Sequence, residues 1–122
     1  VLQFPMYWYS TPALLKQWED DVLLYGWAYG STGNALAGKE LLVAVSTGGA
    51  GDAYSRESSY GCTITELLRP LQATANMVQM TYLEPFTTTG TLTITDEALA
   101  QRVEDYAATL ASKDLPVLEP HG

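Results

Sequence analysis

The sequence is poor in cysteine and histidine, and this scarcity limits the chemistry open to the chain. Its 122 residues include one cysteine, Cys62, and one histidine, His121. A lone cysteine cannot form an internal disulfide, and one cysteine with one histidine makes no recognisable metal-ligand cluster. Both features favour a metal-free protein of the cytoplasm.

Positive charge and long apolar runs are scarce as well. Six Lys and Arg residues stand against 14 Asp and Glu residues, which gives a formal net charge of −8. This sign disfavours direct binding to nucleic-acid phosphates or to anionic lipid. No apolar run approaches the roughly 18 residues of a membrane-spanning helix, and no charged segment followed by an apolar core suggests a signal peptide. We therefore expect a soluble chain with no nucleic-acid partner and no direct membrane insertion.

The chain instead contains alternating strand and helix patterns, with 47% hydrophobic residues, enough for the core of one domain. Strands are predicted at residues 1–4, 41–45 and 82–86. A first helix is predicted from a cap at Thr11 to about Gly26. A second is predicted from a capping box at Thr63 and Glu66 to about Val78, with a kink or break at Pro70, and a third from a cap at Thr95 onward. This order predicts an α/β fold with a parallel sheet.

Two unusual loops follow the first two predicted strands. Residues 5–11 read PMYWYST, and residues 46–61 read STGGAGDAYSRESSYG. Ligands of parallel sheets bind at the carboxyl ends of the strands, where these loops are expected to lie. Aromatic rings can stack on a flat conjugated ligand, and glycines 48 and 49 allow its polar edge to approach the backbone. The pair of loops suits a flavin; alternatively, the aromatic residues cover an open edge of the core and STGG is a turn that ends a strand.

Longer segments carry a resemblance to a known family. LQFPMYWYSTPALLKQWEDDVL, GWAYG, VSTGGAGDAYS and LLRPLQATANMVQMTYLEPF resemble the flavodoxin-like NAD(P)H:quinone reductases, which include DT-diaphorase, the modulator-of-drug-activity proteins and the ancillary proteins of Kef potassium-efflux systems. The match runs from residue 1 to about residue 110, within a single domain whose last residues, 113–122, form a tail. It implies a three-layer parallel sheet and a ping-pong transfer of two electrons from NAD(P)H, through FMN or FAD, to a quinone. FMN is favoured because no residue suggests a pocket for the adenosine half of FAD.

The resemblance also implies roles for particular residues. The loop after the first predicted strand would pack along the flavin ring through Pro5, Met6, Tyr7, Trp8 and Tyr9. The loop after the second would hold the pyrimidine side of the flavin through Ser46, Thr47, Gly48 and Gly49. Tyr54 would lie over the flavin and donate a proton to the developing hydroquinone. Tyr60 stands where some members carry a proton-shuttling histidine, and Tyr29 of GWAYG would reach into the site of a neighbouring subunit, implying a homodimer. For Tyr29 and Tyr60 the alternative is surface or interface packing.

Parts of the family fold have no counterpart in this sequence. In the family two strands and a phosphate-binding loop precede the strand at Val1, so we expect a fragment, inactive by itself, that binds free FMN poorly. Two other functions stay open. One is an ancillary subunit that binds and activates a glutathione-regulated Kef transporter at the inner face of the membrane, and the other is an α/β fragment without activity.

Overall fold

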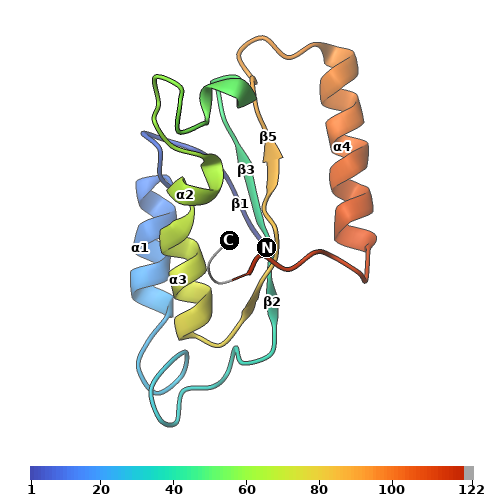
Figure 1. Ribbon diagram of the computed structural model, residues 1–122. Helices are drawn as coiled ribbons and strands as arrows, with labels where there is room; N and C mark the ends of the chain where they lie inside the picture. The colour runs from blue at the N-terminus through green and yellow to red at the C-terminus, as the bar shows by residue number, and fades with distance from the viewer. Residues whose placement is uncertain (120–122) are drawn as a thin grey trace.

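Three parallel strands form the centre of the structure, a computed structural model that describes residues 1–119 (Figure 1). They are β1 (Leu2–Pro5), β3 (Val43–Ser46) and β5 (Phe86–Thr88), in the order β1-β3-β5. A second parallel pair joins β2 (Glu40–Leu41) to β4 (Thr81–Tyr82). The helices are α1 (Ala13–Val22), α2 (Ile64–Leu67), α3 (Arg69–Met77) and α4 (Asp96–Ala111), with a short 3₁₀ turn, η1, at Gly51–Ala53.

The arrangement confirms the predicted α/β fold with a parallel sheet. Helices α1, α2 and α3 lie on one side of the strands and α4 lies on the other (Figure 1). The predicted pairing of the first two strands is confirmed, with Leu2 opposite Val43 and Phe4 opposite Val45. No helix among residues 1–119 combines the length and the apolar character needed to cross a membrane.

Two strands predicted as continuous are each divided in the structure. In the run 41–45, Leu41 pairs with β4, whereas the residues from Val43 onward pair with β1 and β5. The run 82–86 divides into β4 and β5 around Pro85, which has no N–H to donate to a strand ladder. The prediction of single strands was therefore wrong, because hydrophobicity does not show where a chain changes partners.

The boundaries of the first helix also differ from the prediction. The cap is Pro12 rather than Thr11, because the carbonyl of the extended Pro12 (ψ 148°) accepts the first α-helical hydrogen bond, from Lys16 N at 3.3 Å. The helix ends at Val22 and not near Gly26, which lies in the following turn with a φ of +84°.

The other predicted caps are confirmed. Thr63 and Glu66 form a capping box at α2, and Thr95 Oγ1 accepts a hydrogen bond from Ala98 N at the start of α4. The break at Pro70 is present too, since α2 and α3 meet at Leu68.

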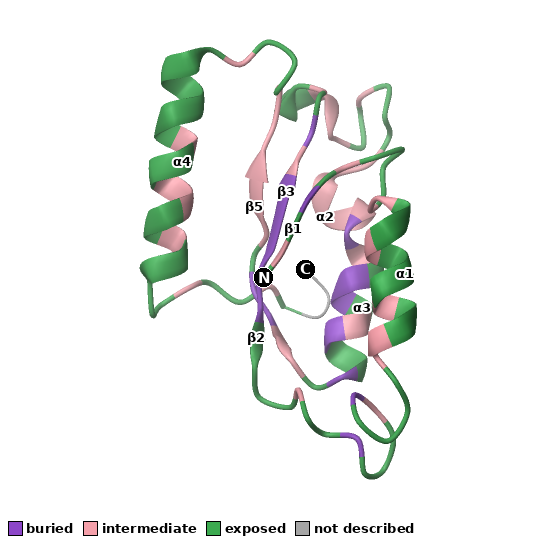
Figure 2. Cartoon of the chain, turned by 180° about the vertical axis from the view of Figure 1, so that it is seen from behind, coloured by how far each residue is buried: buried purple, intermediate pink, exposed green. Residues whose placement is uncertain are grey.

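The core lies between the sheet and α3 (Figure 2). Its buried members are Phe4, Leu41, Val43, Val45, Leu68, Leu71, Ala75 and Tyr82. Helix α4 has no buried residue and meets the strands through a few contacts, such as Tyr106 Oη donating to Gln3 Oε1 at 2.9 Å. In the predicted tail, Leu118 N donates to Tyr82 O at 3.0 Å, while His121 lies outside the described residues.

Candidate functional site

The candidate site lies where the three central strands end. Pro5 is opposite Ser46, and Ser46 is opposite Thr88, so the carboxyl ends of β1, β3 and β5 are level. The loops that follow leave the sheet at the same edge, at the top of Figure 1. Loops 5–11 and 46–61 therefore share one edge, as predicted, and a third loop, residues 89–95, joins them there.

The loop after β1 forms a strained two-residue turn. Tyr7 and Ser10 exchange two backbone hydrogen bonds of 3.0 Å, and the residues between them, Trp8 and Tyr9, have φ angles of 47° and 64°. Two successive positive φ angles define a type I′ turn, which normally contains Asn-Gly. Bulky residues in this conformation cost about 1–2 kcal/mol each, and such strain is common at functional sites. The side chain at the tip, Trp8, is 92% exposed.

Three tyrosines connect this turn to the loop after β3. The rings of Tyr9 and Tyr60 lie edge to face with centroids 5.5 Å apart, and Tyr60 meets Tyr54 in the same way at 5.1 Å. Both phenol groups converge on Gly49, where an added Cβ would be 3.0 Å from Tyr60 Oη and 3.4 Å from Tyr54 Oη. Tyr60 therefore packs between the two loops, which agrees with the alternative considered for it; a catalytic role for either tyrosine stays a prediction.

Hydrogen bonds within the protein fix the backbone of the STGG turn. Thr47 Oγ1 donates to Gly49 O at 2.9 Å, and the same carbonyl accepts from Gly90 N at 2.8 Å. Thr91 donates to Thr47 O from both N and Oγ1. Within residues 1–119, the N–H groups of Gly48 and Gly49 have no acceptor. The turn thus leaves two backbone donors for a ligand.

Both hydrogen-bond donors of Thr47 have partners within the protein. Its side chain is buried, its hydroxyl donates to Gly49 O, and its N–H donates to Thr88 O at 2.9 Å. Both donors are therefore used to shape the turn, and a contact between Thr47 and a cofactor stays a prediction.

The third loop was missed from the sequence. Leu92 is 85% exposed, and a Cβ on Gly48 would be 3.3 Å from Leu92 Cγ. The glycine turn TTTGTLT was the available signal, but the strand before it was predicted to end at Phe86 rather than Thr88.

Tyr29 lies away from this edge. It is in the loop after α1, where its ring packs edge to face on Tyr25 at 5.7 Å and its carbonyl accepts from Gly26 N at 2.9 Å. The structure therefore does not bring Tyr29 together with Tyr54 in one chain, and its contact with a neighbouring subunit's site stays a prediction.

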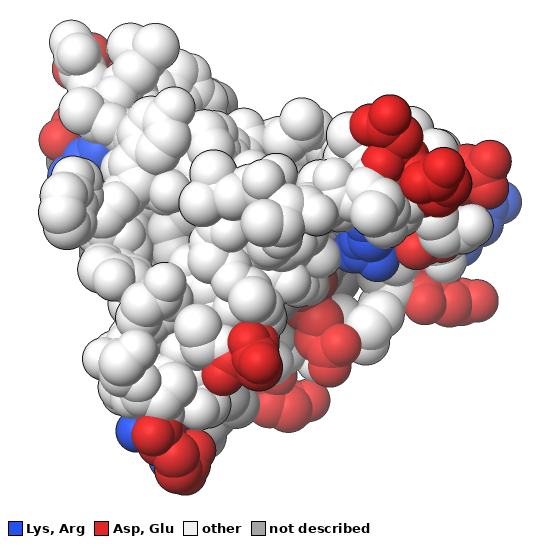
Figure 3. Space-filling model, turned by 90° about the horizontal axis from the view of Figure 1, so that it is seen from above, with Lys and Arg blue, Asp and Glu red and all other residues white. Residues whose placement is uncertain are grey.

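Few charged groups surround the three loops. Figure 3 looks down on this edge, and its central surface is uncharged while most acidic groups lie toward the periphery. Among residues 1–119, no group of three or more His, Cys, Asp or Glu side chains is placed to hold a metal ion. The site therefore offers aromatic rings, hydroxyl groups and backbone amides to a ligand.

Comparison with known proteins assigns the fold family. A family model described as "Flavodoxin-like fold" matches residues 1–110. The chain belongs to the flavodoxin-like family.

Curated relatives of this flavodoxin-like chain carry oxidoreductase and transporter-associated names. An uncharacterized NAD(P)H oxidoreductase, YrkL of Bacillus subtilis, is 55% identical over 109 residues, covering 87% of this chain and 63% of the relative. The glutathione-regulated potassium-efflux system ancillary protein KefF of an Enterobacter species is 46% identical over 110 residues, covering 90% of this chain and 61% of the relative. The chain thus spans about three fifths of the length of these relatives, so the activity of the whole protein is a matter for proposal.

Solved structures share the fold closely. An NADPH-quinone reductase from P. pentosaceus superposes with a TM-score of 0.84 at 41% identity, covering 93% of this chain and 66% of that one. General stress protein 14 of Treponema denticola, in complex with FMN, gives 0.77 at 44% identity, covering 87% and 60%. A structure described as a thermophilic tryptophan halogenase from Streptomycin violaceusniger gives 0.89 at 48% identity, covering 92% and 65%. Two of the five proteins named here are described as an oxidoreductase or a quinone reductase, and the other three carry different names. A shared fold does not fix function.

Proposed function

We propose that the complete protein is an FMN-dependent NAD(P)H:quinone oxidoreductase that works by a ping-pong mechanism, and that residues 1–122 supply the ring-binding side of its flavin site. The observation that carries this proposal is that the N–H groups of Gly48 and Gly49, beside a strained aromatic turn, have no acceptor within residues 1–119. The FMN complex of a 44% identical neighbour and the oxidoreductase names of relatives support the choice of cofactor and reaction.

The residues at this edge fit a flavin ring. A flat ring with carbonyl oxygens and ring nitrogens along one side needs close backbone donors there and apolar surface along its length. Gly48 and Gly49 supply the donors without a Cβ in the way, and residues 5–9, with Trp8 at the tip, supply the apolar surface. When bound, the flavin would accept a hydride from NAD(P)H and return two electrons to a quinone.

The protein side of the reaction consists of positioning and proton donation. The contact with Tyr60 and the position near Gly49 support a role for the Tyr54 hydroxyl as the donor of a proton to a quinone oxygen as that oxygen gains charge. Tyr60 keeps Tyr54 in place and joins it to the turn at Tyr9. The uncharged central surface at this edge supports the binding of a neutral, aromatic acceptor.

The test uses the complete protein, purified and saturated with FMN. We expect bound FMN in a one-to-one ratio, NAD(P)H oxidation that depends on an added benzoquinone, and parallel lines in double-reciprocal plots, as a ping-pong cycle requires. Protein that neither retains FMN nor oxidises NAD(P)H in the presence of a quinone would refute the proposal. Tighter binding of FAD than of FMN would refute the choice of cofactor alone.

A second function is favoured by one specific observation, the 46% identity to KefF proteins. In this alternative the protein is an ancillary subunit, located in the cytoplasm and at the periphery of the inner membrane, that activates a Kef-type transporter. Its net charge of −8 is compatible with docking on a basic cytoplasmic domain. The ancillary role is tested by measuring potassium efflux in cells with and without the protein, at equal transporter levels. Equal efflux rates would reject this role.

We also propose a homodimer in which Tyr29 contacts the partner's site. Sedimentation of the complete protein tests the dimer, and Tyr29→Ala is expected to lower turnover only if the site is shared between subunits.

A further inference from the structure

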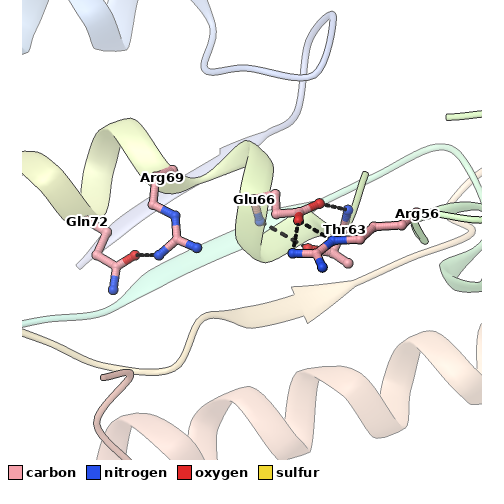
Figure 4. Close-up of polar contacts among 5 residues, drawn as sticks. All are labelled: Arg56, Thr63, Glu66, Arg69 and Gln72. Carbon is pink, nitrogen blue, oxygen red and sulfur yellow. Dashed lines mark hydrogen bonds and ion pairs between the residues drawn. The ribbon is translucent and has the colours of Figure 1, made fainter. Parts of the chain in front are cut away.

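An ion pair fixes the loop of Tyr54 and Tyr60 to the start of α2. Arg56 Nε donates to Glu66 Oε1, and Arg56 Nη2 contacts the same oxygen (Figure 4). The other carboxylate oxygen, Oε2, accepts from the backbone N–H of Thr63 at 2.9 Å. The Glu66 carboxylate therefore caps α2 and also holds the preceding loop through Arg56, ten positions earlier in the chain.

The helix end of this pair is a firm anchor. Glu66 N donates to Thr63 Oγ1 at 3.1 Å, which completes the capping box. Ile64 packs against the core cluster, and Leu68, which follows α2, is 3% exposed. Movement of Glu66 relative to the sheet would disturb these contacts, so the carboxylate provides a fixed point.

The loop end is ordered by its own hydrogen bonds. Ser58 Oγ lies within hydrogen-bond distance of the carbonyls of Ala53 and Ser55, and it accepts from Tyr60 N at 3.3 Å. The N–H of Tyr54 donates to Gly51 O at 3.2 Å. Because these bonds tie residues 53–60 into one unit, fixing Arg56 fixes the whole unit.

We propose that Arg56 and Glu66 are positioning residues, and that their ion pair sets the place of Tyr54 and Tyr60 over Gly49. This inference rests on the proposed quinone reductase function and names what orients the proton donor in that site. Lowering of the Glu66 pKa by the Thr63 N–H and by Arg56 agrees with a carboxylate held in its charged form.

The effect is expected in position rather than in stability. The Arg56 side chain is 73% exposed, and ion pairs at such exposure contribute little to folding. A misplaced catalytic group is more sensitive, since an error of about 1 Å can lower a rate by up to about 100-fold.

Two substitutions separate the pair from the helix cap. Glu66→Gln keeps a side-chain acceptor for the Thr63 N–H, as Gln suits this position of a capping box, but it removes the charge facing Arg56. Arg56→Met removes the cation and leaves the capping box intact. Lys16→Met is the matched control, because the Lys16 side chain is 63% exposed, comparable to the 73% of Arg56, and its ion pair with Asp20 lies on another element, α1.

The experiment measures amide hydrogen exchange and steady-state kinetics on the FMN-loaded complete protein. In Glu66→Gln and Arg56→Met we expect faster exchange across residues 53–61 and a fall of about 10-fold in kcat for a quinone, with unchanged FMN content. Arg56→Lys should restore part of kcat, the double variant should be no worse than either single one, and Lys16→Met should match the wild type.

Three results would overturn the inference. The first is unchanged hydrogen exchange in Glu66→Gln and Arg56→Met, and the second is faster exchange in these variants with unchanged kcat. The third is a kcat in the double variant that is well below the kcat of either single variant. A wild-type protein without quinone turnover would instead refute the proposed function, and exchange in the same variants would then still decide whether the pair holds the loop.

Discussion

Exchange of Trp8-Tyr9 for Asn-Gly tests whether the strained turn serves a ligand. Both residues have left-handed φ angles, 47° and 64°, at the two central positions of a type I′ turn. Left-handed backbone costs about 1–2 kcal/mol per ordinary residue, and Asn-Gly is the preferred pair at these positions. Removing this strain should therefore stabilise the fold by about 2–4 kcal/mol before other losses.

The main loss is the edge-to-face contact of Tyr9 with Tyr60, worth about 0.5–1.5 kcal/mol. Trp8 loses little, because it is 92% exposed. The free energy of unfolding of the complete protein should thus rise by about 0.5–3.5 kcal/mol, after the contact loss is subtracted from the strain relief.

The same exchange should weaken FMN binding by about 10-fold or more, since two aromatic surfaces beside the ring are lost. Urea denaturation of the apoprotein gives the first quantity, and fluorescence titration with FMN gives the second. The exchange Leu110→Ala, on the exposed side of α4, serves as a control for removing an exposed apolar group. A less stable variant, or one with unchanged FMN affinity, would show that the aromatic pair is retained for packing and not for a ligand.

Other predictions concern single residues. Gly49→Ala places a methyl group 3.0 Å from Tyr60 Oη and should lower FMN affinity by about 10-fold by blocking one backbone donor, and equal affinity in titrations would contradict this placement. Tyr54→Phe should leave FMN content unchanged and lower quinone turnover by about 10-fold, and unchanged kinetics would make Tyr54 a packing residue. Burial raises the pKa of Tyr82 to about 12, against about 10 in an unfolded chain, so the folded state keeps this proton longer and stability should fall as pH rises from about 10 to 12. Tyr82→Phe should flatten this fall of stability with pH. It should also raise stability by about 1 kcal/mol, because the buried Tyr82 hydroxyl has no partner among residues 1–119. An unchanged slope in alkaline denaturation would refute the assignment of the pH dependence to Tyr82.

Much of the fold could be predicted because its signals are local. Capping residues at Thr63 and Thr95 mark helix starts through hydrogen bonds to amides three residues on. The apolar run at 41–45 predicted a buried strand because both faces of the sheet region are covered. The parallel pairing then followed from the alternation of strands with helices.

The errors lie where distant residues decide. Leu41 and Val43 belong to different strand pairs because Leu41 pairs with Tyr82 whereas Val43 pairs with Leu2, and these pairings are set by tertiary contacts. Loop 89–95 was missed for the same reason, since its approach to Gly48 depends on the exact end of β5.

Residue roles at the site were predicted mainly from the resemblance to a family, and the structure adds what the sequence pattern lacked. The stretch PMYWYS does not show that Trp8 and Tyr9 adopt left-handed φ angles, which tertiary contacts of the loop must stabilise. The letters STGG do not show that Thr47 turns its donors inward, or that the two glycine amides have no acceptor in the described part of the chain.

The reaction has to be argued from these loops, because the fold leaves it open. Structures described as a quinone reductase and as a tryptophan halogenase superpose on this chain with TM-scores of 0.84 and 0.89. What distinguishes one reaction from another is therefore the chemistry at the carboxyl edge. Here that edge combines three features: backbone strain at Trp8, backbone donors at Gly48 and Gly49 that have no acceptor among the residues described, and the proposed positioning of Tyr54 by the Arg56–Glu66 ion pair. The left-handed turn costs free energy, and the two glycine amides have no acceptor within residues 1–119. A flat ring with a polar edge would stack on the aromatic turn, accept hydrogen bonds from the two amides and lie beside the tyrosine hydroxyl.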